Sequence, residues 1–235
     1  MKVAIVGLGG SYADYMSARI ASQEFDEVWG INCIGAVIYV DKTFMMDPIS
    51  RFLDTENAGT QTGVAREFLK KNKNPIYTCQ LDDRVDELKL YPLEKVTKEL
   101  GYCYFNNTVA YAVAYAIWSK VTCICLYGID YTYKNVSMAE SGRACVEFWC
   151  GIAATKGIKL EIAHRSSLLD TNVPDNEKLY GYHRLDDPLV STATNGSMLI
   201  TKKSKLEPPE PLDSQPNLIG REDIPGVSYE EKKNV

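Results

Sequence analysis

The chain has 235 residues, of which 45% are hydrophobic and 24% charged, and its formal net charge is −5. This is the composition of a globular protein with enough length for one sizeable core. It favours one domain with a decorated C-terminal end over two full domains. The acidic balance argues against a nucleic-acid footprint over the whole surface, and leaves only a local basic groove open.

We expect a cytoplasmic protein without a signal peptide or a membrane span. The first apolar run, residues 3–6, is too short for a signal, and no apolar segment approaches the ~20 residues of a span. The seven cysteines lie mostly in apolar segments and form no Cys-x-x-Cys pair, which indicates buried free thiols in a reducing compartment. A zinc site is disfavoured, because neither His164 nor His183 has ligand spacing to the cysteines.

The first strand is predicted over residues 2–6, and a helix over residues 12–22. Between them lies a glycine-rich turn made of Gly7, Gly9, Gly10 and Ser11. Glycines let the backbone approach a phosphate, and the helix N-terminus supplies N–H donors. Tyr12 stands where the dinucleotide fingerprint has its third glycine. A phosphate-binding loop is therefore the leading interpretation and a tight structural turn the alternative. Ser11 and Asp14 resemble a capping pair.

The next two predicted strands, residues 27–32 and 36–40, place polar groups at their ends. Asn32 stands where an NAD site has an acidic residue, and its amide can bind a sugar or a base edge. Asp41 follows the third strand, and Asp47 precedes Pro48 at the start of a short helix. Asp41 and Asp47 are candidate substrate contacts, although an N-cap is the plainer role for Asp47.

Residues 106–133 are the most informative stretch. Residues 109–119 carry no charge and predict a helix that is buried nearly all round, and residues 121–126 predict a central strand of a parallel sheet. Asn107 and Thr108 lie at the helix N-terminus, where an anion is favoured. Gly128 and Asp130 follow the strand, at the edge where open α/β sheets bind ligands. The plain alternative is that Asn107 caps the helix and Asp130 sits in a turn.

The remaining pattern completes an α/β fold. Residues 64–71, 92–100 and 137–155 predict helices, 75–78 and 158–162 strands, 166–168 a short helix, and 81–90 charged surface. This alternation predicts a single Rossmann-like domain over residues 1–172, with a mostly parallel sheet flanked by helices. Residues 173–205 are expected to form a lid, around residues 180–184, and a hairpin with Asn195-Gly196 at its turn. Residues 206–235 form a proline-rich extended tail that is a candidate for homo-oligomer contacts.

These motifs resemble those of the bacterial lipooligosaccharide sialyltransferases and the related motility-accessory-factor and hydroxymethylpterin-diphosphokinase-like proteins. The matching segments are Val-Gly-Leu-Gly-Gly-Ser after the first strand, Trp-Gly-Ile-Asn at the second, Asp41 after the third, and Ile-Cys-Leu-Tyr-Gly-Ile-Asp-Tyr after the alanine-rich helix. The resemblance covers roughly residues 1–172. It implies a Rossmann-like domain that transfers a group from an activated nucleotide, often a nucleotide sugar.

The resemblance also implies roles for single residues. Carried over by position, donor-binding roles fall on Gly9, Gly10, Ser11, Asn32, Asn107 and Thr108. Gly7 and Gly128 are further donor-binding candidates at the two strand ends, and Tyr182 and Arg184 are candidates because the leaving nucleotide phosphate needs hydrogen-bond donors or positive potential. Asn107 and Thr108 stand where the sialyltransferases have a Thr-Ser-Gly segment, so the Ser-Gly pair is missing here. Asp130 would hold the site, and His183 in the lid is the candidate general base, with His164 as its competitor.

The leading functional hypothesis is a glycosyltransferase-like enzyme that uses a nucleotide sugar as co-substrate and no tightly bound cofactor. The chain has no Asp-x-Asp motif, which favours a metal-independent mechanism. The acceptor is open among a glycan, a small molecule, a protein and a modified nucleobase. The first alternative is an ATP-dependent diphosphokinase-like transferase, with Mg²⁺ held by Asp41, Asp47 and Asp130. The second is a non-catalytic nucleotide-binding or assembly protein. Tyr12 and Asn32 make a dehydrogenase the least favoured reading.

Overall fold

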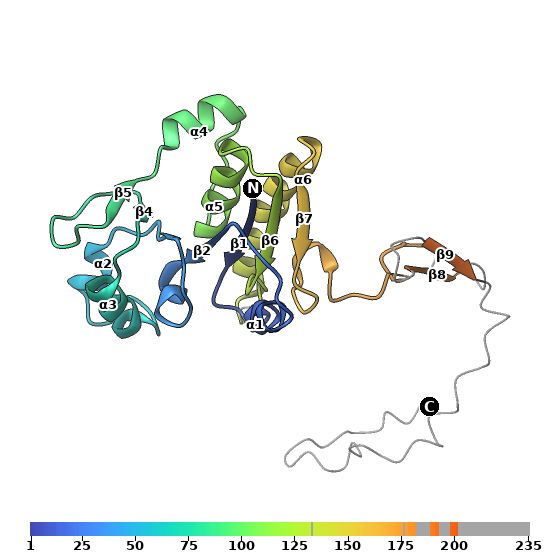
Figure 1. Ribbon diagram of the computed structural model, residues 1–235, viewed down its shortest axis with the longest axis horizontal. Helices are drawn as coiled ribbons and strands as arrows, with labels where there is room; N and C mark the ends of the chain where they lie inside the picture. The colour runs from blue at the N-terminus through green and yellow to red at the C-terminus, as the bar shows by residue number, and fades with distance from the viewer. Residues whose placement is uncertain (133, 176, 182–188, 193–197, 202–235) are drawn as a thin grey trace, which may run out of the picture. The chain divides into compact units, whose positions relative to one another are not determined.

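Figure 1 shows the computed structural model of the chain, which describes residues 1–132, 134–175, 177–181, 189–192 and 198–201. The chain divides into two compact units, Met1–Pro174 and Asp175–Val235. Within the described ranges, no helix is long and apolar enough to cross a membrane.

The first unit is built on a sheet of seven strands. They are β1 Lys2–Val6, β2 Glu27–Ile31, β3 Lys42–Phe44, β4 Ile76–Thr78, β5 Leu88–Leu90, β6 Cys123–Tyr127 and β7 Lys159–Ile162. Their order is β5-β4-β3-β2-β1-β6-β7, and all neighbours are parallel. The order reverses between β1 and β6. Strands β2 to β5 lie on one side of β1, whereas β6 and β7 lie on its other side. This is a doubly wound, Rossmann-like α/β fold, which confirms the predicted fold class.

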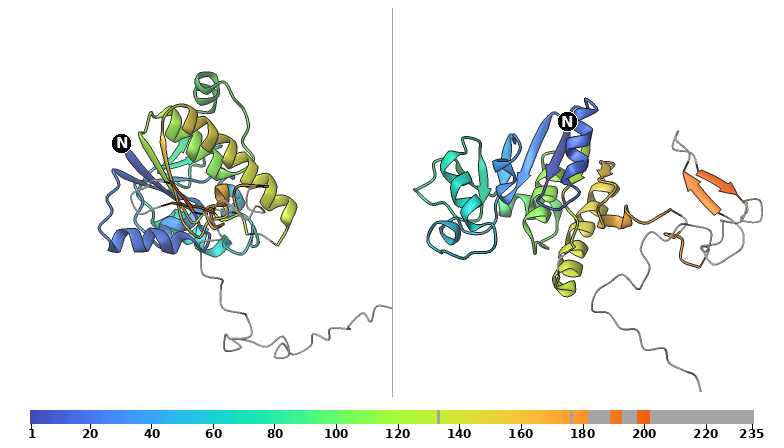
Figure 2. Two further views of the ribbon diagram at one scale, coloured as in Figure 1. Left: turned by 90° about the vertical axis from the view of Figure 1, so that its right-hand side faces the viewer. Right: turned by 90° about the horizontal axis from the view of Figure 1, so that it is seen from below.

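Helices cover both faces of this sheet (Figure 2). They are α1 Tyr12–Ile20, α2 Ser50–Leu53, α3 Thr62–Lys71, α4 Leu93–Leu100, α5 Thr108–Trp118 and α6 Val136–Thr155. The pleat of β1 explains the two layers, since successive side chains point to opposite faces. Val3 and Ile5 pack with α5 and α6, while Ala4 and Val6 pack on the side of α1.

α5 is the most buried helix, as the sequence predicts. Ala110, Ala112, Val113, Ala114 and Ala116 are all fully buried. Alanine side chains let the helix axis approach the sheet closely, and the helix lies against β1, β2 and β3.

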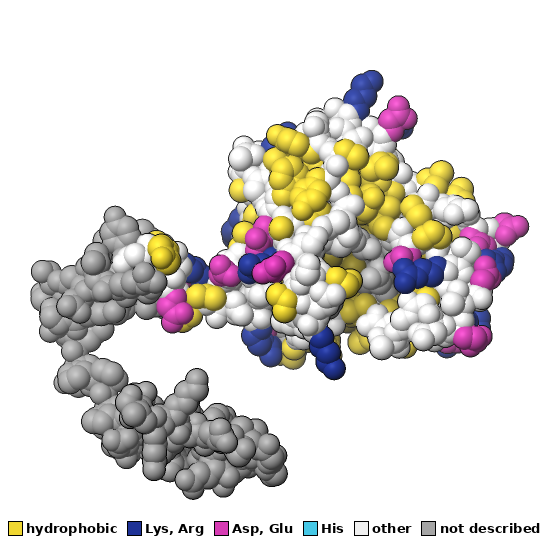
Figure 3. All heavy atoms as spheres, turned by 180° about the vertical axis from the view of Figure 1, so that it is seen from behind, with side chains coloured by type: hydrophobic (Ala, Val, Ile, Leu, Met, Phe, Trp, Pro, Cys, Tyr) yellow, Lys and Arg dark blue, Asp and Glu magenta, His cyan; other side chains and the backbone are white. Residues whose placement is uncertain are grey.

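On the face shown in Figure 3, an apolar area is bordered by neighbouring acidic and basic side chains.

The predicted third strand is wrong. After β2 the chain forms a 3-10 helix, η1 Asn32–Ala36, and the strand begins only at Lys42. Residues 36–40 look like a strand in sequence because they are apolar, but Val37 and Tyr39 are 67% and 72% exposed. Gly35 turns the chain tightly against α3, since a Cβ there would lie 2.6 Å from the ring of Phe68. The apolar run is therefore a crossover that exposes Val37 and Tyr39 and buries Val40.

This shift moves Asp41 away from the expected edge. Asp41 precedes β3 instead of following a strand, and its Oδ2 accepts the backbone N–H of Val28 at 2.7 Å. It thus lies at the amino ends of β2 and β3, opposite the edge where α/β sheets bind ligands.

The structure can also be compared with three smaller predictions: the charged segment 81–90, the short helix at 166–168 and the C-terminal hairpin. The charged segment 81–90 contains β5, a three-residue edge strand whose Lys89 and Leu90 are exposed, which suits an edge position. The short helix expected at residues 166–168 is a 3-10 turn at Leu168–Asp170. In the second unit, β8 Leu189–Thr192 pairs antiparallel with β9 Met198–Thr201, which is the strand pairing expected of the predicted hairpin. The expected turn at residues 195–196, the core of the lid at 182–184 and the tail at 206–235 lie outside the described residues.

Candidate functional site

A cleft of about 470 Å³ lies where the strand order reverses. Its walls come from the segments that follow β1, β2, β3 and β6 and from the start of α5. The lining residues are Gly7, Leu8, Gly9, Ile31, Asn32, Asp47, Gln61, Asn107, Thr108, Val109, Gly128, Ile129, Asp130, Tyr131 and Thr132. Both the position and the size are those of small-molecule sites in doubly wound sheets.

The glycine loop after β1 interlocks with the loop after β6. The Gly7 N–H donates to the Tyr127 carbonyl and the Gly9 N–H to the Gly128 carbonyl, both at 2.8 Å. Gly128 has φ of +66°, and a Cβ there would overlap the Gly7 carbonyl. These glycines are thus required by the close backbone approach of two loops. Gly7, Gly9 and Gly128 also line the cleft, whereas Gly10 is exposed and outside its lining.

Asp130 holds this glycine loop in place through hydrogen bonds to Ser11. Its side chain is only 8% exposed. Its Oδ2 accepts the Ser11 N–H at 2.7 Å, and its Oδ1 accepts the Ser11 hydroxyl. The Ser11 Oγ in turn accepts the Gly128 N–H at 2.9 Å. Both carboxylate oxygens therefore bond within the protein, which makes Asp130 a positioning residue. The expected Ser11–Asp14 capping pair is wrong, because Ser11 makes no capping bond and Asp14 binds Arg165.

The N-terminus of α5 opens onto the cleft. Asn107 is its N-cap, as the plain interpretation predicts: its Oδ1 accepts the Ala110 N–H at 3.0 Å, and its Nδ2 donates to the Gly142 carbonyl at 3.0 Å. The Asn107 amide is therefore held by the protein, and Thr108 and Val109 follow it in the wall. The first turn of α5 carries no acidic residue. The helix thus presents its positive end to the cleft, and its own first turn holds no carboxylate that would neutralise it.

Asn32 is a polar side chain of the cleft that lacks a hydrogen-bond donor for its amide oxygen. Its Oδ1 is buried and has no hydrogen-bond partner among the described residues. Its backbone is left-handed, with φ of +54°, and Tyr131 in the same lining has φ of +48°. A buried unpaired amide oxygen and a left-handed non-glycine residue each cost free energy, and such costs concentrate at binding sites.

A second pocket of about 240 Å³ adjoins the cleft and shares Asn32, Asp47 and Gln61 with it. Arg51 lines this pocket, and its Nη1 lies 2.5 Å from the Asp47 Oδ1. Asp47 is not an N-cap, since α2 begins after Ile49 and has no side-chain cap. Sequence reasoning missed Arg51 and Gln61. The i, i+4 spacing of Asp47 and Arg51 is the signal that could have revealed the pair.

The cleft gathers most of the predicted site residues of the first unit. Gly7, Gly9, Asn32, Asp47, Asn107, Thr108, Gly128 and Asp130 all line it. Ser11 is buried behind its wall, and Asp41 lies at the other end of the sheet. His164 is exposed after β7 and is not part of the lining. Tyr182, His183 and Arg184 lie outside the described residues.

Comparison with known proteins gives a likeness of fold. No family model and no curated protein matches the chain. Similar solved structures include the sialyltransferase CstII from Campylobacter jejuni in complex with the substrate analogue CMP-3FNeuAc, at 19% identity over 72% of this chain and 82% of that chain, with a TM-score of 0.46. The same enzyme with cytidine-5'-monophosphate matches at 20% identity over 72% and 81%, with a TM-score of 0.43. The sialyltransferase CST-II with a trisaccharide acceptor and CMP matches at 18% over 72% and 83%, with a TM-score of 0.44.

Proposed function

We propose that this protein is a glycosyltransferase and that its nucleotide-sugar donor occupies the cleft between the loops after β1 and β6. The observation that carries the proposal is the unpartnered Oδ1 of Asn32, which lies in the same cleft as the N-terminus of α5. A ribose or sugar hydroxyl, or a base amine, supplies the donor that Asn32 lacks. A phosphate fits the helix N-terminus. The sequence resemblance to sialyltransferases points to the same donor class.

The chemistry follows from where negative charge develops. As the glycosidic bond breaks, the leaving nucleotide phosphate gains charge at the positive end of α5. Well-placed hydrogen-bond donors stabilise such a transition state by ~3 kcal/mol each. Asp130 contributes indirectly, because it holds Ser11 and with it the glycine loop. A general base must deprotonate the acceptor hydroxyl, and we assign this role to His183, with Tyr182 and Arg184 assisting departure of the nucleotide.

The positions of the carboxylates favour this function over a Mg²⁺-dependent diphosphokinase. Such an enzyme needs Asp41, Asp47 and Asp130 to converge on the metal. Asp41 lies at the opposite end of the strands, Asp47 is paired with Arg51, and both oxygens of Asp130 bond to Ser11. We therefore propose a metal-independent transfer, with a glycan, small molecule, protein or nucleobase as acceptor.

Donor hydrolysis tests this proposal without knowledge of the acceptor, since water can replace the acceptor hydroxyl. The protein is incubated with a panel of nucleotide sugars, with and without chelator, and the released nucleotide is quantified by chromatography. We expect release from one donor class, unchanged by chelator and strongly reduced in His183→Ala. His164→Ala is the matched control and keeps the activity. Release of AMP from ATP that requires Mg²⁺ would instead establish the diphosphokinase, and no release from any donor contradicts an enzymatic role for the cleft.

A further inference from the structure

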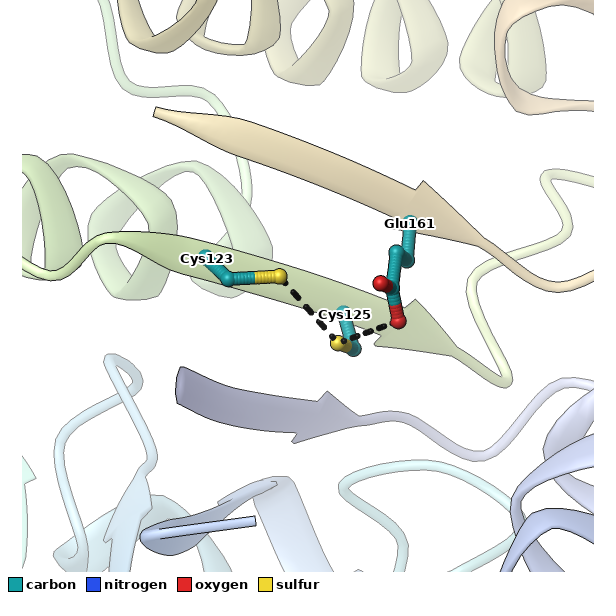
Figure 4. A group of neighbouring side chains, drawn as sticks. All are labelled: Cys123, Cys125 and Glu161. Carbon is teal, nitrogen blue, oxygen red and sulfur yellow. Dashed lines mark hydrogen bonds between the residues drawn. The ribbon is translucent and has the colours of Figure 1, made fainter. Parts of the chain in front are cut away.

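A cluster of two thiols and a carboxylate lies on the α1 face of the sheet, outside the cleft (Figure 4). Cys123 and Cys125 alternate along β6, so both side chains point to the same face. Their sulfur atoms are 3.8 Å apart. Glu161 on β7 is the direct neighbour of Cys125 in the strand register, and its Oε2 lies 3.2 Å from the Cys125 Sγ. The three ligand atoms all lie within 4.8 Å of one another.

This spacing matches that of a tetrahedral zinc-type centre. Zn–S bonds of ~2.3 Å at a tetrahedral angle place two sulfur atoms ~3.8 Å apart, and a Zn–O bond of ~2.0 Å places the oxygen ~3.5 Å from each sulfur. The observed 3.8 Å agrees with the first distance, and the 3.2 Å between Sγ and Oε2 needs only a small expansion. The sheet register therefore brings the three donors within 4.8 Å of one another, and two of their three separations are close to those of a tetrahedral centre. No histidine is needed, because the third donor comes from the adjacent strand.

We propose that Cys123, Cys125 and Glu161 bind a thiophilic divalent cation of the zinc class, with water in the fourth position. Two metal–sulfur bonds and one metal–oxygen bond form, and the two thiol protons leave to the solvent. Two thiolates and a carboxylate carry three negative charges, so the bound cation leaves one.

The surroundings complete this site. The Lys2 Nζ and the Gln23 Nε2 lie 3.1 and 3.2 Å from the Glu161 Oε2, and the Lys159 Nζ lies 2.6 Å from the Oε1. The two ammonium groups more than offset the one remaining negative charge, and all three groups orient the carboxylate as outer partners of metal ligands do. Cys125 is fully buried, but Cys123 is 7% exposed and the Glu161 side chain 28%. The cation therefore has access from the side of Glu161.

Cobalt(II) added to the full-length protein tests this site by spectroscopy. The exposed thiols of Cys79 and Cys103 are first removed as Cys79→Ser and Cys103→Ser, so that they cannot contribute sulfur ligands. We expect one cobalt per chain, a sulfur-to-cobalt charge-transfer band and the intense d–d bands of a tetrahedral centre, all displaced by zinc. Absence of a sulfur-to-cobalt band in this folded protein overturns the proposal.

Single variants locate the metal. Cys123→Ser is chosen because Cys123 is the less buried of the two thiols. It removes the charge-transfer intensity of one sulfur and weakens cobalt binding by at least ~10-fold, and Glu161→Gln weakens cobalt binding by a similar factor. Cys150→Ala is the matched control, since Cys150 is a buried thiol of α6 outside the cluster, and it leaves the spectrum unchanged. If the charge-transfer intensity is unchanged in Cys123→Ser, or is lost in Cys150→Ala while both proteins stay folded, the metal is elsewhere and the assignment is wrong.

Discussion

Asp130 illustrates how one carboxylate can organise a loop that it does not belong to. Ser11 stands at the end of the glycine loop, 119 positions before Asp130 in the sequence. The two residues are nonetheless joined by two hydrogen bonds. The same serine oxygen accepts the Gly128 N–H, so three backbone segments meet at one buried hydroxyl. The shape of the cleft wall therefore depends on a contact that is remote in sequence.

Replacing Asp130 by asparagine tests this positioning role. Asparagine keeps only one acceptor oxygen, so Asp130→Asn leaves one of the two buried Ser11 donors, the N–H or the hydroxyl, facing the Nδ2 donor without an acceptor. We expect the free energy of unfolding to fall by about 1–3 kcal/mol, measured by denaturant titration. Asp26→Asn is the control, since Asp26 also accepts a backbone N–H but is exposed. A loss below about 0.5 kcal/mol in Asp130→Asn, the range of ordinary surface changes, contradicts the role.

Sequence reasoning reached the site residues unevenly, for physical reasons. Asn107, Gly128 and Asp130 could be placed because helix caps and strand ends are local signals. The pairing of Ser11 with Asp130 could not, since Asp14 offered a nearer partner and only the sheet brings position 130 to position 11. Arg51 and Gln61 escaped notice because both belong to the segment between β3 and α3, whose course depends on packing.

At the scale of elements, the contact between the loops after β1 and β6 predicts that a glycine-to-alanine substitution destabilises the protein at Gly128. The same substitution at Gly151, which lies outside this contact, should stabilise it. Gly128→Ala places a methyl group against the Gly7 carbonyl at a φ of +66°. We expect a loss of about 2 kcal/mol or more in the free energy of unfolding. Gly151→Ala lies in α6 with open space around its Cβ, so it stabilises by about 0.5–1 kcal/mol. Thermal unfolding of both variants measures the contrast, and equal effects would show that the loops have room to separate.

The ion pair between α1 and the segment after β7 makes a pH prediction. Partial burial acts to raise the pKa of Asp14, but the hydrogen bonds and charge of Arg165 outweigh it and lower that pKa below its usual 3.8. Because the folded-state pKa lies below the unfolded one, the stabilisation is complete above pH 3.8 and is lost as the pH falls through the folded-state value.

Asp14→Asn therefore reduces stability at neutral pH by at most about 1 kcal/mol, since the Arg165 side chain is exposed. The difference from the unchanged protein disappears in acid below the folded-state pKa of Asp14. Urea titrations across this pH range provide the measurement. A difference that stays constant down to the acid end means that Arg165 does not stabilise the ionised Asp14.

The element that sequence reasoning misplaced shows the limit of hydrophobic pattern. Residues 36–40 have strand-like composition, but the strand next to β2 is formed by the less apolar segment Lys42–Phe44. A strand of three residues is too short for an alternating hydrophobic pattern to be recognised in the sequence. By contrast, α5 and β6 were predictable because burial on every side requires an uninterrupted apolar run.

At the scale of the whole molecule, the proposed function predicts that the division after Pro174 separates donor binding from the proposed base. Every described residue that lines the cleft belongs to the first unit, whereas His183 belongs to the second. We expect a fragment of residues 1–174 to unfold cooperatively and to bind the donor like the full chain, but to lack donor hydrolysis. Calorimetry and chromatography measure the two properties. Full hydrolysis by the fragment contradicts the assignment of His183, and a fragment that does not fold contradicts the independence of the first unit.

The central claim is that the cleft binds a nucleotide sugar through Asn32, and calorimetric titration of the full chain and of Asn32→Gly tests it most directly. Glycine accepts the φ of +54° without strain, so the free energy of unfolding should change by no more than about 1 kcal/mol. Loss of the Oδ1 acceptor should nonetheless weaken donor binding by about 10–100-fold. Equal affinity in the two proteins, with both folded, would contradict the claim and place the donor elsewhere.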